Sequence, residues 1–189
     1  KDILNLVYLC RHFGLPEVAD YWESVVKLNT WQQHRIARLV VHQLFGTVTG
    51  KRLAILGFAF KADTNDTREA PAIRICRDLL EEGAQLAIHD PKVAAQQMVR
   101  DLLQEAAPKA DSLSGTGSWL QAGSVEEAVT GADAVLVLTE WQQYRDLNWM
   151  DLAGRLRKPA WVFDARAVAD PERVRDAGLT LWRVGDGEG

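Results

Sequence analysis

Apolar residues recur at helical spacing along the first part of the chain. Asp2 is a suitable N-cap, and Ile3, Val7 and Cys10 then fall on one face of a short amphipathic helix. Gly14 ends this pattern, because glycine readily adopts the left-handed conformation that closes a helix. The chain begins with Lys1-Asp2 directly in the helical pattern, so we expect it to be a piece of a longer protein.

A second helical pattern covers residues 16–45 and begins with Pro16. A continuous helix of this length would measure about 45 Å, more than a small domain needs for its own core. Two interpretations have equal weight: one long connector or dimer helix, or two ordinary helices broken near Asn29-Thr30. A dimer helix would turn an apolar stripe outward to cover a second copy, formed by Trp22, Val26, Ile36 and Val40.

After Gly50 the pattern changes to short apolar strands that alternate with helices. This alternation predicts an α/β fold with a parallel, doubly wound, Rossmann-like sheet of six strands in the order 3-2-1-4-5-6. We expect two parts, a helical connector or dimerisation segment over residues 1–46 and the sheet domain over residues 47–189. The predicted strands are residues 53–58, 85–89, 118–122, 134–138, 160–163 and 180–184.

Composition and charge narrow the functional classes. The formal net charge of -4 and pI near 5.6 argue against a nucleic-acid partner, which usually requires a basic surface. The apolar runs are too short to cross a membrane, and no metal-ligand pattern is present. Cys10 and Cys76 lie within helical patterns as small apolar residues, which fits the reducing cytoplasm. Residues 106–117 are rich in Ala, Ser, Gly and Asp and predict a mobile loop.

Candidate chemistry lies where the first strand ends. The turn Gly57-Phe58-Ala59-Phe60-Lys61 lacks the G-x-G-x-x-G pattern that lets a backbone approach a dinucleotide pyrophosphate. Lys61 offers a point charge for a phosphate, and an aromatic ring offers a stacking surface for a base. Asp90 ends the second strand, where NAD-binding sheets keep a ribose-binding acid, but Asp-Pro also starts turns.

Several motifs together resemble the C-terminal part of the UDP-glucose 6-dehydrogenases of the UDP-glucose/GDP-mannose dehydrogenase family. The resemblance covers nearly the whole chain, and the motifs occur in the family's order. They are Leu15-Pro16-Glu17-Val18-Ala19, Asn29-x-x-Gln32-x-x-Arg35, the long string from Gly57 to Glu69, His89-Asp90-Pro91-Lys92-Val93, Thr139-Glu140-Trp141 and Phe163-Asp164-x-Arg166.

The resemblance implies oxidation of UDP-glucose to UDP-glucuronate with two NAD⁺. It implies an NAD-binding domain upstream of this chain, a homodimer formed through the helix of residues 16–45, and a UDP-binding C-terminal domain. The family's nucleophilic cysteine would lie upstream of Lys1, so these residues would bind UDP without catalysing the oxidation. Sister families that act on GDP-mannose or UDP-N-acetylmannosamine share this architecture.

Individual roles follow from the same resemblance. Asp2 resembles the catalytic aspartate that activates water, and Lys1 resembles a cofactor-side residue. Phe60, Lys61 and Arg166 resemble substrate contacts. Arg68 resembles a contact to NAD across the domain cleft. UDP is therefore expected where residues 53–58, 134–138 and 160–163 end, with residues 139–141 closing the edge.

Two other functions remain open from the sequence. One is a plain NAD(P)-binding module with Asp90 on the ribose, which the missing glycines weaken. The other is an assembly module with no ligand of its own, in which residues 16–45 carry the function.

Overall fold

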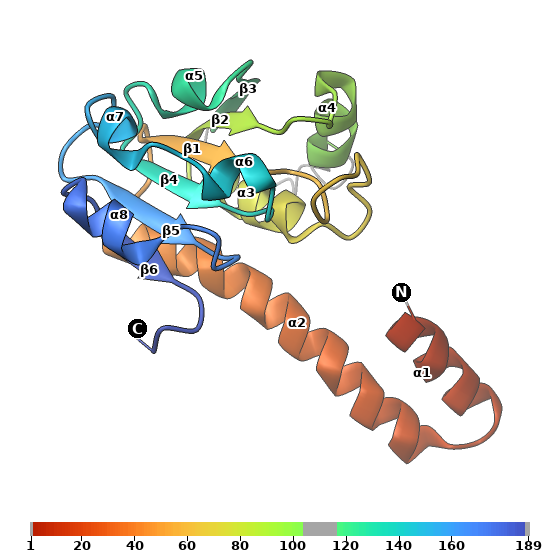
Figure 1. The fold of residues 1–189 in the computed structure, drawn as a ribbon. Helices are drawn as coiled ribbons and strands as arrows, with labels where there is room; N and C mark the ends of the chain where they lie inside the picture. The colour runs from red at the N-terminus through yellow and green to blue at the C-terminus, as the bar shows by residue number, and fades with distance from the viewer. Residues whose placement is uncertain (1, 104–116, 188–189) are drawn as a thin grey trace.

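The computed structural model describes residues 2–103 and 117–187. Lys1, expected on the cofactor side, lies outside the described residues, as does the predicted mobile loop apart from Gly117. The chain forms a helical hairpin followed by a sheet covered with helices on both faces (Figure 1).

The hairpin consists of α1 (Asp2–His12) and α2 (Pro16–Gln43). Gly14 adopts a φ of 73°, and the amide of Leu15 donates to the carbonyl of Cys10, so the chain reverses within a few residues. α2 is a single helix of 28 residues, which makes the alternative of a break near Asn29-Thr30 wrong. Thr30 is accommodated inside the helix because its hydroxyl donates to the carbonyl of Val26 at 3.1 Å.

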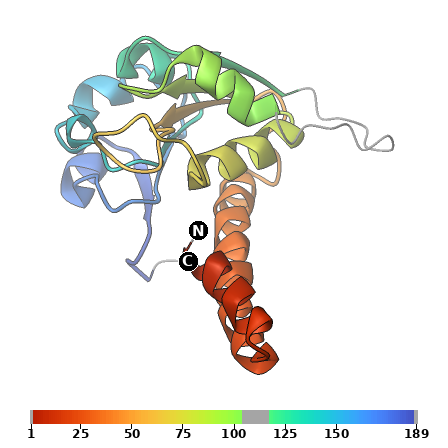
Figure 2. The ribbon, with the colours of Figure 1, turned by 90° about the vertical axis from the view of Figure 1, so that its right-hand side faces the viewer.

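The two halves of α2 bury different faces. The inner half packs Ile36 and Val40 into the main core, while the outer half carries Ala19 against Val7 and Cys10 of α1 (Figure 2). The predicted outward stripe is therefore wrong for Ile36 and Val40. Other apolar residues are exposed on α2 instead: Tyr21 is 65% exposed, Leu28 64% and Trp31 49%. The division into residues 1–46 and 47–189 stays a prediction.

The sheet has six parallel strands in the order β3-β2-β1-β4-β5-β6, as predicted. The register places Leu56 beside His89 on one side and Val137 on the other. The strands are β1 (Arg52–Leu56), β2 (Gln85–His89), β3 (Ser118–Gln121), β4 (Ala134–Val137), β5 (Trp161–Asp164) and β6 (Thr180–Arg183).

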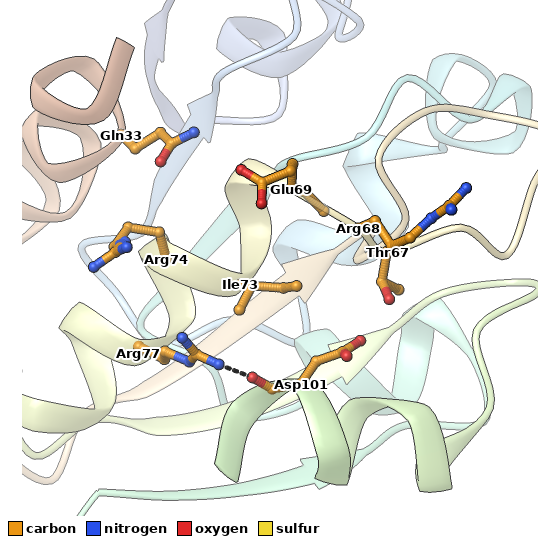
Figure 3. A pocket seen from close by; sticks show the side chains of 9 residues that line it. Gln33, Thr67, Arg68, Glu69, Ile73, Arg74, Arg77 and Asp101 are labelled. Carbon is orange, nitrogen blue, oxygen red and sulfur yellow. Dashed lines mark hydrogen bonds between the residues drawn. The ribbon is translucent and has the colours of Figure 1, made fainter. Parts of the chain in front are cut away.

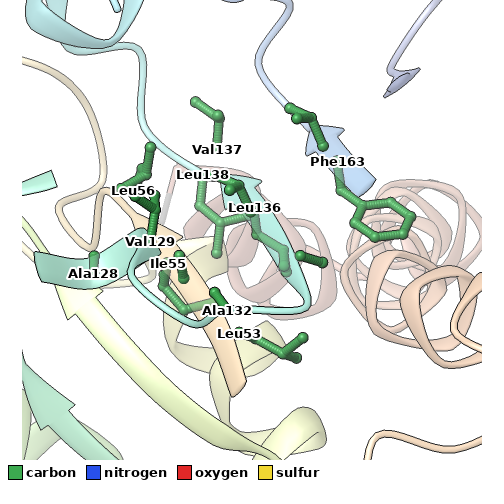
Figure 4. Close-up of a cluster of buried hydrophobic side chains, with 14 of the residues drawn as sticks. Leu53, Ile55, Leu56, Ala128, Val129, Ala132, Leu136, Val137, Leu138 and Phe163 are labelled. Atoms are coloured by element: carbon green, nitrogen blue, oxygen red, sulfur yellow. The ribbon is translucent and has the colours of Figure 1, made fainter. Parts of the chain in front are cut away.

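Helices cover both faces of this sheet. The inner half of α2 lies with α3 (Pro71–Glu81) and α4 (Ala95–Leu103) on one face. The other face carries α5 (Val125–Val129), α7 (Trp149–Ala153) and α8 (Pro171–Asp176), and α6 (Gln142–Arg145) follows the end of β4. β1 and β4 are buried throughout apart from Arg52, and their Leu53, Ile55 and Leu136 side chains meet in the core (Figure 4). A strand buried on both faces explains why these segments are continuously apolar.

The strand order reverses between β1 and β4. The chain leaves β1 toward α3 on one face and leaves β4 toward α6 and α7, so the two following loops separate at the carboxyl edge. Such a switch point is where open α/β sheets hold ligands.

These two loops touch closely at Gly57, which adopts a φ of 97°. A Cβ added at Gly57 would lie 2.4 Å from the Cβ of Thr139 and 2.7 Å from its backbone nitrogen. The buried Thr139 hydroxyl in turn donates to the carbonyl of Ala59 at 2.7 Å. Gly57 is therefore required both for its backbone conformation and for this close approach.

We expect Gly57→Ala to lower the free energy of unfolding by about 3 to 5 kcal/mol, since left-handed strain and overpacking add. Gly131→Ala is the matched control, because Gly131 has a φ of 70° with open space around its added Cβ. The control should lose only about 1 to 2 kcal/mol in urea denaturation. Equal losses would mean that the contact with Thr139 contributes nothing.

Candidate functional site

Asp90 fastens three segments at the carboxyl edge of the sheet. Its Oδ2 accepts hydrogen bonds from the amides of Phe58 and Ala59 at 2.7 and 3.0 Å and from Trp141 Nε1 at 3.2 Å. Its Oδ1 accepts from the amides of Lys92 and Val93 at 2.9 and 3.0 Å. The buried carboxylate thereby joins the loops that follow β1, β2 and β4.

These bonds decide between the two interpretations of Asp90. A carboxylate has about four lone-pair sites, and the five protein donors occupy them. The amides of Phe58 and Ala59, which a dinucleotide-binding turn would present to a pyrophosphate, also donate inward to Asp90. Asp90 is therefore a structural acceptor, and the geometry argues against a ribose-binding role.

Asp164, at the end of β5, plays a parallel part on the other side of the switch point. It is fully buried, and its Oδ2 accepts from the amides of Val168 and Ala169, each at 2.7 Å. Its Oδ1 accepts from the amide of Arg166 at 3.0 Å. The loop after β5 is thus wrapped around one carboxylate, which determines where the Arg166 side chain begins.

The Arg166 side chain crosses from this loop to the other two. Its Nε donates to the carbonyl of Leu138 at 2.8 Å, and its Nη2 donates to the carbonyl of Phe60 at 3.3 Å. Glu140 Oε2 lies 3.6 Å from Arg166 Nε. Arg166 is therefore a preorganised cation at the meeting point of the loops after β1, β4 and β5.

Phe60 and Lys61 are brought to the same edge. Phe60 is 46% exposed, and its amide donates to the carbonyl of Asp66 at 2.8 Å, which closes the loop on itself. Lys61 is exposed, and its ammonium makes no hydrogen bond or ion pair with the described parts of the chain. The structure thus brings together Phe60, Lys61 and Arg166, with residues 139–141 beside them.

Arg68 belongs to a different surface. Its guanidinium donates to both carboxylate oxygens of Asp66, at 2.9 and 2.6 Å, and this partner raises the Arg68 pKa. Arg68 lines a polar pocket of about 280 Å³ between α2, α3 and α4 (Figure 3). Phe60, Lys61 and Arg166 do not line this pocket, which also contains Gln33, Thr67, Glu69, Ala70, Ile73, Arg74, Arg77 and Asp101.

Asp2 is also separate from the three residues at the sheet edge. It begins α1, which packs on the outer half of α2 (Figures 1 and 2). Among the described residues, no hydrogen bond or ion pair joins Asp2 to Phe60, Lys61 or Arg166.

Sequence reasoning missed three polar groups that organise this edge. Glu140 was expected only as part of a closing loop, yet its Oε1 also accepts from the amide of Ala62 at 3.4 Å. Thr139 was expected in the same closing loop but not as the partner of Gly57 and Ala59, and Asp164 was only part of a motif. A polar residue directly after a buried strand was the available signal, but its partners depend on loop paths that local patterns do not encode.

A buried pair of aromatic side chains supports the loop after β4. Tyr144 donates its hydroxyl to the carbonyl of His89 at 3.0 Å, which leaves the same oxygen to accept from His89 Nδ1 at 3.0 Å. Burial raises the pKa of Tyr144, so the hydroxyl keeps its proton. Burial lowers the pKa of His89, although the nearby charges of Asp90 and Glu126 oppose this shift. The histidine is therefore held in its neutral form.

Residues 2–103 and 117–187 contain no group of three or more His, Cys, Asp or Glu side chains arranged to hold a metal ion. Within the same ranges, no helix has the length and apolar character needed to cross a bilayer.

A protein-family model matches residues 54–171, the segment that contains most of the sheet and all three loops of this edge. Its description is the UDP-glucose/GDP-mannose dehydrogenase family, UDP binding domain.

Curated proteins match over nearly the whole chain. UDP-glucose 6-dehydrogenase 5 of Oryza sativa subsp. japonica is 44% identical over 197 aligned residues, which cover 98% of this chain. The UDP-glucose 6-dehydrogenase of Caenorhabditis elegans is 42% identical over 98% of this chain. The chain spans 40% of the length of the rice protein and 38% of the nematode protein.

Solved structures share the fold at lower identity. A UDP-glucose dehydrogenase from Pyrobaculum islandicum aligns with a TM-score of 0.69 and 24% identity, covering 96% of this chain and 35% of that one. A GDP-mannose dehydrogenase from Pseudomonas aeruginosa aligns with a TM-score of 0.59 and 18% identity, covering 89% of this chain and 37% of that one.

The neutral burial of His89 generates a pH prediction. Below about pH 6.5 the unfolded chain binds a proton at this histidine while the folded chain does not. The free energy of unfolding therefore decreases as the pH is lowered, until the pH reaches the lower pKa that His89 has in the folded chain. In His89→Asn, whose amide can replace the Nδ1 donor, the acid-dependent loss between about pH 7 and pH 5 should shrink, by at most about 1.4 kcal/mol per pH unit.

Urea denaturation across this range measures the effect. His12→Asn is the control, because it removes a histidine that lies exposed on α1 instead of in the core. An identical pH dependence in wild type and His89→Asn would contradict the prediction.

Proposed function

Since this chain belongs to the UDP-glucose/GDP-mannose dehydrogenase family and contains its UDP-binding domain, we propose that it is the UDP-sugar-binding portion of an NAD-dependent UDP-glucose 6-dehydrogenase. The whole protein would oxidise UDP-glucose to UDP-glucuronate with two NAD⁺. The convergence of Phe60, Lys61 and Arg166 at the β1/β4 switch point is the observation that carries this proposal.

The chemistry of these three residues suits a nucleoside diphosphate. Arg166 donates its Nε proton and one Nη2 proton to backbone carbonyls. Its other guanidinium protons remain to be donated to phosphate oxygens. Lys61 adds a mobile point charge, and the exposed Phe60 ring offers a flat apolar surface to a base or ribose. Two cations that extend from different loops would orient the diphosphate as well as bind it.

NAD does not fit the first turn of this sheet. The amides that would face a pyrophosphate are bonded to Asp90, and Thr139 fills the space beside Gly57. NAD would therefore be bound mainly by a separate domain. Arg68 would contribute through guanidinium protons not donated to Asp66, and Lys1 from the cofactor side.

Asp2 remains a proposed catalytic residue that would activate water in the full protein. Its place on α1, remote in sequence from the sheet loops, is compatible with a site completed by another domain. UDP-glucose is the favoured substrate because the curated relatives at 44% and 42% identity carry that name. The structures named for GDP-mannose and UDP-N-acetylmannosamine dehydrogenases are 18% and 21% identical.

A homodimer formed through α2 is the second part of the proposal. The observation that favours it is the row of exposed apolar side chains at Tyr21, Leu28 and Trp31, from the outer half to the middle of the helix. Their spacing of seven and three residues puts them on one face, which a two-fold related copy of the same helix would cover.

For the nucleotide site, we expect Lys61→Ala and Arg166→Ala each to weaken UDP binding about ten- to a hundredfold, because each removes a charge-assisted contact. Arg157→Ala is the control, since Arg157 is an exposed cation paired with Asp133 at the opposite edge of the sheet. Isothermal titration calorimetry measures all four proteins. UDP affinities equal to wild type in both site variants would place the site elsewhere.

A simpler measurement separates this function from that of a ligand-free assembly module. Saturating UDP should raise the melting temperature of the wild-type chain, because a ligand that binds only the folded state stabilises it. No shift at millimolar UDP would favour the assembly module.

For the dimer, we expect Leu28→Glu to weaken self-association at least about tenfold, because a buried carboxylate would face its own copy across the two-fold axis. Met150→Glu is the control, since Met150 is 65% exposed on α7. Sedimentation equilibrium gives the dissociation constants. A wild-type chain that stays monomeric at about 50 μM would contradict the dimer.

A further inference from the structure

We propose that Glu140 is a built-in competitor of the nucleotide phosphates, whose negative charge neutralises Arg166 and keeps UDP affinity low. This inference rests on the proposed UDP site. It adds a residue that determines how tightly that site holds an anion and how readily it releases one.

The position of Glu140 is the first support. Its Oε2 lies 3.6 Å from Arg166 Nε, and its Oε1 accepts from the Ala62 amide at 3.4 Å. The carboxylate therefore sits between Arg166 and the residue that follows Lys61. A diphosphate that contacted both Lys61 and Arg166 would have to approach this fixed negative charge.

The way in which Arg166 is held is the second support. Backbone carbonyls of Leu138 and Phe60 accept from its guanidinium, and its own amide is bonded to Asp164. The 3.6 Å separation from Glu140 is longer than a hydrogen bond. Arg166 thus has its orientation without Glu140, and the contribution of the carboxylate to it is charge.

The partial exposure of the pair sets the size of the effect. The side chains of Arg166 and Glu140 are 28% and 34% exposed, so water screens their attraction in part. A unit charge a few ångströms from a bound diphosphate would still weaken binding by about three- to tenfold. That is enough to adjust the release of a product without removing the binding site.

The alternative is that Glu140 is a scaffold that helps to place the loop after β1. Glutamine keeps an oxygen for the Ala62 amide while losing the charge. If Glu140 acted only through this bond, Glu140→Gln would therefore leave UDP binding unchanged, whereas removal of a competing charge would tighten it.

The experiment is calorimetric titration of the 189-residue chain with UDP and with uridine. Glu140→Gln should bind UDP about three- to tenfold more tightly than wild type, and the difference should shrink as salt rises. Uridine has no phosphate, so its affinity should not change. Glu82→Gln is the matched control: Glu82 is exposed beside the amino end of β2, at the opposite edge, and the same change of net charge there should leave UDP affinity unaltered.

Glu140→Gln with unchanged or weaker UDP binding would overturn the proposal, as would an equal gain for uridine or for Glu82→Gln. If Glu140→Gln melts well below wild type, Glu140→Asp replaces it. Its shorter side chain withdraws the charge from Arg166, so UDP should bind more tightly by a smaller factor, and weaker binding would overturn the proposal. A wild type that binds neither UDP nor uridine contradicts the proposed function itself, which is a separate result.

Discussion

The carboxyl edge of this sheet depends on two buried carboxylates that collect backbone amides. An ionised aspartate loses its hydration when it is buried, and it is tolerated only if donors replace the water. Asp90 finds five such donors and Asp164 finds three, all in loops that follow the parallel strands. The cost of leaving either carboxylate unpaired therefore constrains the paths of the loops after β1, β2, β4 and β5 together.

This constraint explains why a Rossmann-like sheet here does not offer a dinucleotide turn. A phosphate-binding turn needs amides that point outward and space for a pyrophosphate beside them. In this chain the corresponding amides of Phe58 and Ala59 point inward to Asp90, and Thr139 occupies the space at Gly57. In the proposed site, anion recognition would depend on the side-chain cations Lys61 and Arg166 in place of backbone amides.

The sequence predicted the sheet well and the site in part, for physical reasons that differ. Strands buried on both faces give continuous apolar segments, and Gly14 and Pro16 mark where the hairpin turns, so element order and topology follow from local patterns. The exposed face of α2 was predicted wrongly because helical spacing shows that Ile36 and Val40 share a face with Trp22, but not which neighbour covers it. The Arg166 environment was not predictable from local patterns, because the groups around it come from other loops. The carbonyl of Phe60, which helps to orient Arg166, is 106 residues away along the chain.

The two cations of the proposed site differ in what they contribute. Arg166 is anchored to backbone carbonyls of two other loops, so little side-chain entropy remains to be lost when it meets an anion. Lys61 is exposed and keeps its conformational freedom, so each contact it makes must offset the cost of ordering a long side chain. A fixed cation with a carboxylate beside it specifies position, while a mobile one adds charge wherever the second phosphate lies. A site with one fixed and one mobile cation would be selective for the spacing of two phosphates without holding either of them tightly.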